Sequence, residues 1–229
     1  MSEPAAATTT TAFVRAGSPS YNPIVVDPAL QARFGCSMQA FLDREYTNTT
    51  TTTTTALGSV KPQCLATGAV VFNASRTAVL LVQRSASDSM PGLWETPGGG
   101  VDADDATVLS AVVRELWEEV GLRAASVRFV VPCRGHGDGD DVVDGGHDDA
   151  LTQVFLTRRG RVVAKFNFVV DIEDDDAAAV VLDPREHQAY VWATEEECVR
   201  GARGEVQLPI TTREQREVIL NAWRIVKGL

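Results

Sequence analysis

A glycine run followed by a short segment with three glutamates constrains this chain more than any other feature. Gly98, Gly99 and Gly100 form the run, and the segment Glu115-Leu116-Trp117-Glu118-Glu119 follows it. On a helix that turns about 100° per residue, the three glutamates lie within an arc of roughly 100°. Carboxylates at this spacing repel one another and lower the stability of the helix. A hard divalent cation such as Mg²⁺, which prefers oxygen ligands, is the simplest partner that makes the arrangement favourable.

The same segment has an apolar side that predicts how the helix packs. Five apolar residues recur at helical spacing, offset from the glutamates: Leu109, Val112, Val113, Leu116 and Val120. Such a stripe faces a protein core, and Gly121 is a typical residue to end a helix. An acidic triplet alone is most often the solvated face of an ordinary helix. The glycine turn, the apolar stripe and the glycine stop together favour a functional site.

This segment resembles the Nudix box, the signature of the Nudix hydrolase family. That signature runs Gly, five residues, Glu, seven residues, and then Arg-Glu-apolar-x-Glu-Glu-x-Gly-apolar. Its second half matches at every defined position: Arg114, Glu115, Leu116, Glu118, Glu119, Gly121 and Leu122. The resemblance implies hydrolysis of a nucleoside diphosphate linked to another moiety, with Mg²⁺ or Mn²⁺ as the cofactor.

The first half of the signature departs from the family pattern. Counted from Gly100, the glutamate of the pattern falls on Ala106. Counted from Gly99, it falls on Asp105, but eight residues then precede the arginine. The first acid is therefore either missing or replaced by Asp105, with one extra residue in the loop. A helix that already ran through residue 105 would point Asp105 towards Glu119, which favours replacement. Acids also favour helix N-termini as caps, so an ordinary role stays open.

The resemblance also implies roles for the matching residues. The expected metal ligands are Glu115, Glu118 and Glu119. Glu115 could instead orient water, and Arg114 is expected to hold a carboxylate in place through a bidentate pair. The family sometimes takes its general base from a distant loop, and Glu186 is the candidate here, with an ordinary exposed acid as an equal alternative. His187 is interpreted as a surface residue.

Candidates for substrate binding lie on both sides of the glycine run. Arg84 ends an apolar run, and Glu95 precedes the glycines, so both are expected to meet a ligand together with Gly99 and Gly100. The glycines have the backbone freedom to curl the loop around the start of the helix. Trp94 is interpreted as a core residue, since aromatic residues in strands are usually buried.

Composition limits the class of partner. The chain has 229 residues, of which 44% are apolar, and a net charge of −10. This acidity and the lack of a basic patch argue against a nucleic acid polymer, but not against a nucleotide whose phosphates a metal can bridge. No apolar run reaches the length of a membrane span, so no membrane partner is expected. Four widely spaced cysteines without a secretory signal are interpreted as reduced thiols. We expect a cytoplasmic enzyme of unknown oligomeric state.

Two regions are expected along the chain. Residues 1–60 are expected to form an N-terminal extension, with a disordered start, a short strand at 24–26, a helix at 37–46 and a threonine-rich linker at 49–55. Residues 61–229 are expected to form the Nudix domain.

Periodicity predicts the elements of that domain. The expected strands cover residues 66–72, 78–83, 126–133, 150–157, 162–172 and 189–193. The first two are expected to pair as a hairpin. Helices are expected up to Val120, after Thr194 and from Thr211 or Thr212. This order predicts an α+β fold, an αβα sandwich with a mixed sheet between helices, which the resemblance also implies. Residues 134–150 are expected to be a mobile acidic loop.

Two other classes of function stay open. The altered first half of the box fits a catalytically silent Nudix-like domain that binds nucleotides or regulates a partner, whereas the intact glutamates favour an enzyme. A structural protein with a coincidental acidic helix is the third reading, and such a protein would not respond to Mg²⁺.

Overall fold

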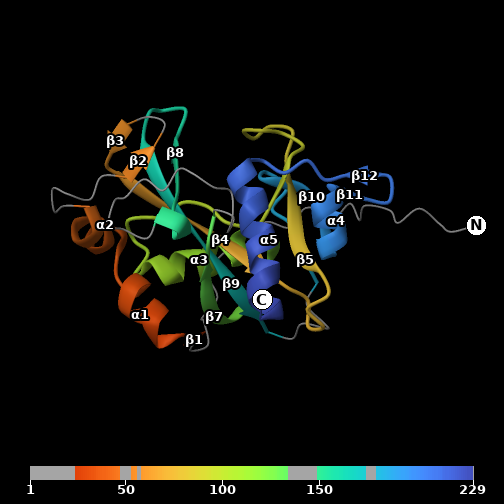
Figure 1. Cartoon of the computed structure of the whole chain (residues 1–229), viewed down its shortest axis with the longest axis horizontal. Helices are drawn as coiled ribbons and strands as arrows, with labels where there is room; N and C mark the ends of the chain where they lie inside the picture. The colour runs from red at the N-terminus through yellow and green to blue at the C-terminus, as the bar shows by residue number, and fades with distance from the viewer. Residues whose placement is uncertain (1–23, 47–52, 56–57, 134–148, 174–178, 229) are drawn as a thin grey trace, which may run out of the picture.

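A mixed β-sheet between two layers of helices makes up the fold (Figure 1). The computed structural model describes residues 24–46, 53–55, 58–133, 149–173 and 179–228. The predicted α+β sandwich is confirmed. In Figure 1, α1 and α2 lie at one end of the molecule, α4 lies at the other, and α3 and α5 lie between them.

The described residues form strands and helices with the following bounds. The strands are β1 (Val25–Val26), β2 (Thr53–Thr55), β3 (Gly58–Val60), β4 (Cys64–Val71), β5 (Val79–Arg84), β6 (Trp94–Glu95), β7 (Ala124–Val131), β8 (Gln153–Leu156), β9 (Val162–Ile172), β10 (His187–Ala193), β11 (Ala202–Arg203) and β12 (Val206–Gln207). The helices are α1 (Pro28–Phe34), α2 (Met38–Tyr46), α3 (Val108–Val120), α4 (Glu195–Arg200) and α5 (Arg213–Lys227), with a 3₁₀ turn at Asp149–Leu151.

Strand β9 organises the main sheet. It pairs parallel with β4 along one edge, and along the other it pairs antiparallel first with β8 and then with β7. β1 pairs parallel with β7 and closes that side. The parallel register brings distant residues together, since Ala66 lies opposite Lys165 and Gly68 lies opposite Asn167. In the same way, the pairing of β8 places Gln153 opposite Lys165.

The two faces of this sheet bury different sets of apolar side chains, because successive residues of a strand point to opposite sides. On β9, Phe166 and Phe168 face the core that also contains the apolar stripe of α3. Val169 faces the second core, which contains Ile219 and Trp223 of α5. The sheet is therefore buried on both sides, except where β4, β8 and β9 border a cleft.

The predicted hairpin between the first two strands of the domain is wrong. β4 and β5 share only the bridge between Phe72 and Val79, and β5 pairs with β10 and β6 in a second sheet. The reason is that the free edge of β4 is occupied by the glycine loop. The N–H of Thr67 donates to the carbonyl of Gly99 at 2.8 Å, and the N–H of Ala69 donates to the carbonyl of Pro97 at 2.8 Å.

Residues before the predicted domain contribute to its core. Phe34 of α1 and Phe41 of α2 are 1% and 0% exposed. Their rings contact Phe166 of β9 edge-on, with centroids 5.1 and 5.3 Å apart. The division between residues 60 and 61 stays a prediction, but the segment 24–46 is packed against the main sheet.

Most of the other predicted elements are confirmed. They include the strand at 24–26, the helices α2, α3, α4 and α5, and the strands β7 to β10. The sequence pattern does not predict α1, which begins at Pro28 after the cap Asp27, nor the short pair β11–β12. Thr53–Thr55 pairs with Gly58–Val60 as a strand rather than forming only a linker.

Several predicted features lie outside the described residues. They are the start of the chain and most of the acidic loop 134–150. The four cysteines are free thiols, as expected. None of the described helices is both long and apolar enough to span a membrane.

Candidate active site

Helix α3 holds the acidic cluster in a fixed position because both ends of the helix are capped. The hydroxyl of Thr107 accepts the N–H of Ser110 at 2.9 Å, and the hydroxyl of Ser110 accepts the N–H of Thr107 at 2.8 Å, which forms a reciprocal cap. Gly121 ends the helix with a φ of 71°, a left-handed conformation that glycine adopts without strain. The predicted apolar stripe is confirmed, since its five residues are at most 5% exposed.

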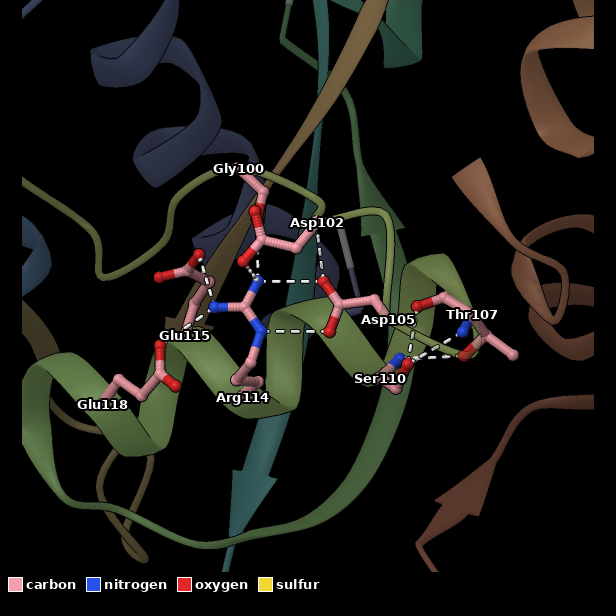
Figure 2. Close-up of polar contacts among 8 residues, drawn as sticks. All are labelled: Gly100, Asp102, Asp105, Thr107, Ser110, Arg114, Glu115 and Glu118. Atoms are coloured by element: carbon pink, nitrogen blue, oxygen red, sulfur yellow. Dashed lines mark hydrogen bonds and ion pairs between the residues drawn. The ribbon is translucent and has the colours of Figure 1, made fainter. Parts of the chain in front are cut away.

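Arg114 is the hub of the site (Figure 2). Its Nε and Nη2 donate to the two oxygens of Asp105 at 3.0 and 2.9 Å. Its Nη1 donates to Glu115 and Glu118, both at 2.9 Å, and its Nη2 also donates to the carbonyl of Gly100 at 2.9 Å. These contacts use all five N–H groups of the guanidinium. The hydrogen bonds to Asp105 are the main reason that the pKa of Arg114 is raised above its usual value.

The structure corrects the predicted position of Asp105. α3 begins three residues later, so Asp105 precedes the helix, and the projection that points it towards Glu119 does not apply. The Asp105 side chain is 6% exposed and forms its bidentate pair with Arg114. Ala106, where the family pattern has glutamate, is exposed. Asp105 therefore supplies a carboxylate to this network, and its replacement of the glutamate of the family pattern stays a prediction.

One of the three loop glycines is required by a close backbone contact. A Cβ at Gly98, whose φ is 148°, would lie 2.2 Å from the carbonyl oxygen of Thr67. A Cβ at Gly99 would lie 2.7 Å from the carboxyl carbon of Glu115, so a side chain there would displace that carboxylate. A Cβ at Gly100 would meet no atom within 4 Å. Side chains are thus excluded where the loop touches β4, and at Gly99 a side chain would disturb the acidic cluster.

Burial raises the pKa values of two of the three glutamates. Glu119 is 3% exposed, and burial, followed by the charge of Glu115, raises its pKa well above the usual value. The N–H of Gly98, which donates to Oε2 of Glu119 at 2.7 Å, opposes that shift. Burial raises the pKa of Glu115 to about 7, against the attraction of Arg114. Glu118 is the most exposed of the three glutamates, with a side chain that is 51% exposed.

The acidic cluster fits a divalent cation by its chemistry, although the side chains are not arranged as a ready coordination set. Within the described residues, no three His, Cys, Asp or Glu side chains are placed to hold a metal ion. Glu115 and Glu118 engage Arg114, and Glu119 engages Gly98. All the candidate metal ligands are carboxylates, the ligand type that suits Mg²⁺ and Mn²⁺. A cation among them would offset the repulsion that raises their pKa values.

The loop before β10 joins the end of α3 and brings Glu186 towards the cluster. The N–H groups of Val181 and Asp183 donate to the carbonyls of Val120 and Glu119, each at 2.9 Å. Glu186 is exposed at the end of this loop. Its negative charge contributes to the raised pKa values of both buried glutamates. The candidate base is therefore close enough to the cluster to act on it electrostatically.

His187 is not the surface residue that the sequence analysis predicts. It is 2% exposed, because β10 pairs it with Arg84 inside the second sheet. Its Nε2 lies 3.6 Å from Oε1 of Glu95. Burial alone would raise the pKa of Glu95, but the interaction with His187 and the charges of Lys165 and Arg84 outweigh it and lower that pKa. Glu95 thus stays ionised at the wall of the cleft.

A cleft with a volume of about 760 Å³ opens beside the glycine loop. The four residues predicted to bind substrate all line it, namely Arg84, Glu95, Gly99 and Gly100. Arg84 is largely engaged within the protein, since it donates to Glu95, to Asp88 and to the carbonyl and hydroxyl of Ser89. Trp94 is 1% exposed and packs in the core, as predicted.

Comparison with known proteins assigns this site to a family. The sequence model of the NUDIX domain matches residues 62–214, which contain the glycine loop, α3 and all but one of the residues that line the cleft. The chain belongs to the Nudix family. The acidic helix and most of the cleft beside it are therefore parts of a Nudix domain.

Two curated relatives of this Nudix chain are named for nucleotide substrates. It is 29% identical over 132 residues to the CTP pyrophosphohydrolase of Escherichia coli. The aligned region covers 58% of this chain and 78% of that protein. It is 37% identical over 84 residues to the putative 8-oxo-dGTP diphosphatase 2 of Mycobacterium tuberculosis, over 37% of this chain and 53% of that protein. The shared region thus spans about half of the second relative.

The fold is shared with solved structures. The MutT protein from Methanosarcina mazei superposes with a TM-score of 0.50 at 20% identity, covering 73% of this chain and 97% of that one. A likeness at this identity shows the Nudix fold alone.

Two polar residues that the sequence does not identify as site residues, Lys165 and Gln153, also line the Nudix cleft. The side chain of Lys165 extends over β4 next to Gly68. A Cβ at Gly68 would lie 3.2 Å from Cε of Lys165, so the lack of a side chain at Gly68 leaves room for the lysine. Within the described part of the chain, its ammonium has no hydrogen bond or ion pair. A lysine inside the apolar run of β9 is the signal that could have found it, because a charge in a buried strand has to reach water or a counter-charge.

Replacement of Asp105 tests the bidentate pair. Asp105→Asn leaves the guanidinium of Arg114 without its main counter-charge, so the free energy of unfolding should fall by about 2–3 kcal/mol in urea denaturation. Asp104→Asn is the control, since Asp104 is exposed and should change stability by less than about 0.5 kcal/mol. Equal, small effects of the two substitutions would show that Asp105 is not part of the network.

The pKa of Glu115 predicts how the stability of the metal-free protein depends on pH. Glu115 ionises near pH 4.5 when unfolded and near pH 7 when folded. The folded state therefore binds more protons between these values, and stability falls as the pH rises from about 5 to about 7. In EDTA at about pH 8, Glu115→Gln should be more stable than the wild type by about 2 kcal/mol, with no difference at about pH 4.5.

The half-exposed neighbour Glu118 provides the control for that measurement. Glu118→Gln should change the free energy of unfolding by less than about 0.5 kcal/mol at either pH. A Glu115→Gln protein that gains no stability at the higher pH would contradict the raised pKa.

Proposed function

We propose that this Nudix protein is a metal-dependent hydrolase that cleaves a phosphoanhydride bond in a nucleoside diphosphate linked to another moiety. The observation that carries the proposal is the packing of the acidic helix against the glycine loop at the wall of a cleft. The nucleotide substrates in the names of the two curated relatives support the choice of substrate class.

The acidic cluster has the ligands for the cofactor. Glu115, Glu118 and Glu119 would hold Mg²⁺ or Mn²⁺, which lowers the pKa of bound water and neutralises charge on a diphosphate. The N–H of Gly98 keeps the carboxylate of Glu119 directed at the loop. Arg114 holds Glu115 and Glu118 on one side of the helix, so the carboxylates are oriented before a substrate arrives.

Other residues of the chain would position the substrate and accept a proton. Lys165, which lines the cleft, is suited to a phosphate oxygen. Arg84 and Glu95 form the wall, and Gly99 and Gly100 leave the backbone of the loop open to the cleft. Glu186 is the candidate proton acceptor, because its charge acts on Glu115 and Glu119 from an exposed position.

One observation favours a second candidate, a catalytically silent domain that binds nucleotides or regulates a partner. Two of the three glutamates engage Arg114 instead of a common point. Such a domain would keep the cleft and bind a nucleotide without hydrolysing it.

Turnover by a charge-neutral variant separates the two candidates. With Mg²⁺ or Mn²⁺ and a panel of nucleoside diphosphate conjugates, the wild type should release a phosphate-containing product. Glu119→Gln, which keeps an oxygen for the N–H of Gly98, should lower kcat by about 10²-fold or more because one cation ligand loses its charge. Folding is checked by thermal unfolding in EDTA, where the variant should be at least as stable as the wild type.

The matched control is Glu205→Gln. Glu205 is exposed in the turn between β11 and β12, so this substitution should leave kcat unchanged. If the wild type binds nucleotides but turns over none of the conjugates, the enzyme proposal is wrong and the catalytically silent domain is the function that remains.

A further inference from the structure

A basic turn borders the cleft, and the proposed chemistry does not use it. The turn joins β8 to β9 and has the sequence Thr157-Arg158-Arg159-Gly160-Arg161. The N–H of Thr157 donates to the carbonyl of Arg161, and the N–H of Gly160 donates to the carbonyl of Thr157, each at 2.9 Å. Arg159 and Arg161 line the cleft, whereas Arg158 does not. The turn therefore presents two of its arginines to the cleft from a hydrogen-bonded backbone.

These two arginines have no carboxylate partner within the described residues, although the chain as a whole has a net charge of −10. Both are exposed, and Nη1 of Arg161 donates to Sγ of Cys64 on β4 at 3.9 Å. Two carboxylates line the same cleft within the described residues. Glu95 is engaged inside the protein, and Glu214 is exposed at the start of α5. Positive groups that border a cleft without a counter-charge attract an anion into it.

The basic turn and Lys165 lie at different levels of β4. Cε of Lys165 is next to Gly68, at 3.2 Å from the position of a Cβ there, whereas Arg161 contacts Cys64. Gly68 and Cys64 are four residues apart on β4, so about 13 Å of strand separates the two levels. In Figure 1 the turn after β8 lies at the top of the view, whereas α3 lies near its centre. At these contacts the two cations are too far apart to bind one phosphate group.

The acidic cluster lies at the level of Lys165. A Cβ at Gly98 would be 2.6 Å from Cα of Gly68, so the glycine loop touches β4 there. The N–H of Gly98 also donates to Glu119, which fixes this glutamate at the same level. A diphosphate bound at the cluster is therefore near Lys165, and Arg161 lies further along the cleft.

We propose that Arg159 and Arg161 bind a second anionic group of the substrate, a phosphate on a sugar that also carries the diphosphate. Guanidinium groups suit this role because they donate two parallel hydrogen bonds to a phosphate. A separation on the order of 10 Å along the strand needs a spacer such as a pentose between the two groups, since one more phosphoanhydride link is too short. This inference rests on the proposed function only for the placement of the diphosphate at the box.

Matched nucleotides that differ by one phosphate test this assignment without any hydrolysis. Calorimetric titration of the full chain in excess Mg²⁺ compares ADP with its 2′-phosphorylated and 3′-phosphorylated forms. At least one phosphorylated form should bind about tenfold more tightly than ADP, because it gains charge-assisted hydrogen bonds to arginine. The gain should shrink as the salt concentration rises, since both arginines are exposed. Equal affinities, weaker binding of both phosphorylated forms, or no binding of all three at millimolar concentration would overturn the proposal.

Charge-neutral variants assign the gain to the two arginines. The double variant with Arg159→Gln and Arg161→Gln should bind all three nucleotides with the affinity that the wild type has for ADP. The control Arg158→Gln removes an adjacent, exposed arginine that does not line the cleft, and it should keep the gain. Because all three side chains are exposed, the variants should unfold at the wild-type temperature. A gain that survives in the double variant, or that Arg158→Gln abolishes equally, would overturn the role of Arg159 and Arg161.

Hydrolysis is measured separately, so that the two proposals fail in different ways. A wild type that binds a phosphorylated form more tightly than ADP but hydrolyses no conjugate retains the second anion site and loses the enzyme assignment. A wild type that hydrolyses nucleotide conjugates but binds the three nucleotides equally retains the enzyme assignment and loses the second anion site.

Discussion

The guanidinium of Arg114 is the contact on which the rest of the site depends. It joins a loop carbonyl, a carboxylate that precedes the helix and two carboxylates on the helix, and it uses every donor it has. Without this positive charge, Asp105, Glu115 and Glu118 would repel one another across a short loop. The orientation of these acids and their connection to the loop at Gly100 therefore depend on one cation that the chain itself supplies.

That single cation does not neutralise the whole cluster, and we propose that the excess negative charge is what binds a divalent cation. Glu119 is buried behind the loop with one N–H as its partner, and burial raises the pKa of Glu115 to about 7. A protein selected only for stability would not keep such groups, since each costs free energy when ionised. Residues that lower stability in this way are typical of sites that bind a ligand of opposite charge.

The sequence predicts the helix well and the cleft poorly, for a physical reason. The stripe of α3 and the stop at Gly121 follow from a 3.6-residue period and from local backbone preferences. The position of Asp105 depends on where the helix begins, which the cap at Thr107 decides. Lys165 and Gln153 are neighbours only through the register of β8 with β9, and no local pattern encodes that register. For the same reason the hairpin is mispredicted, because the glycine loop competes for the edge of β4.

We propose that the acidic cluster carries protons that a divalent cation displaces when it binds. Titration of Mn²⁺ into the metal-free protein, by calorimetry in two buffers of different ionisation enthalpy, counts the protons released on binding. Since burial raises the pKa values of Glu115 and Glu119, protons should be released at pH 7, and fewer at about pH 9. Binding of Mn²⁺ at pH 7 with no release of protons, or no binding at all, would contradict the account.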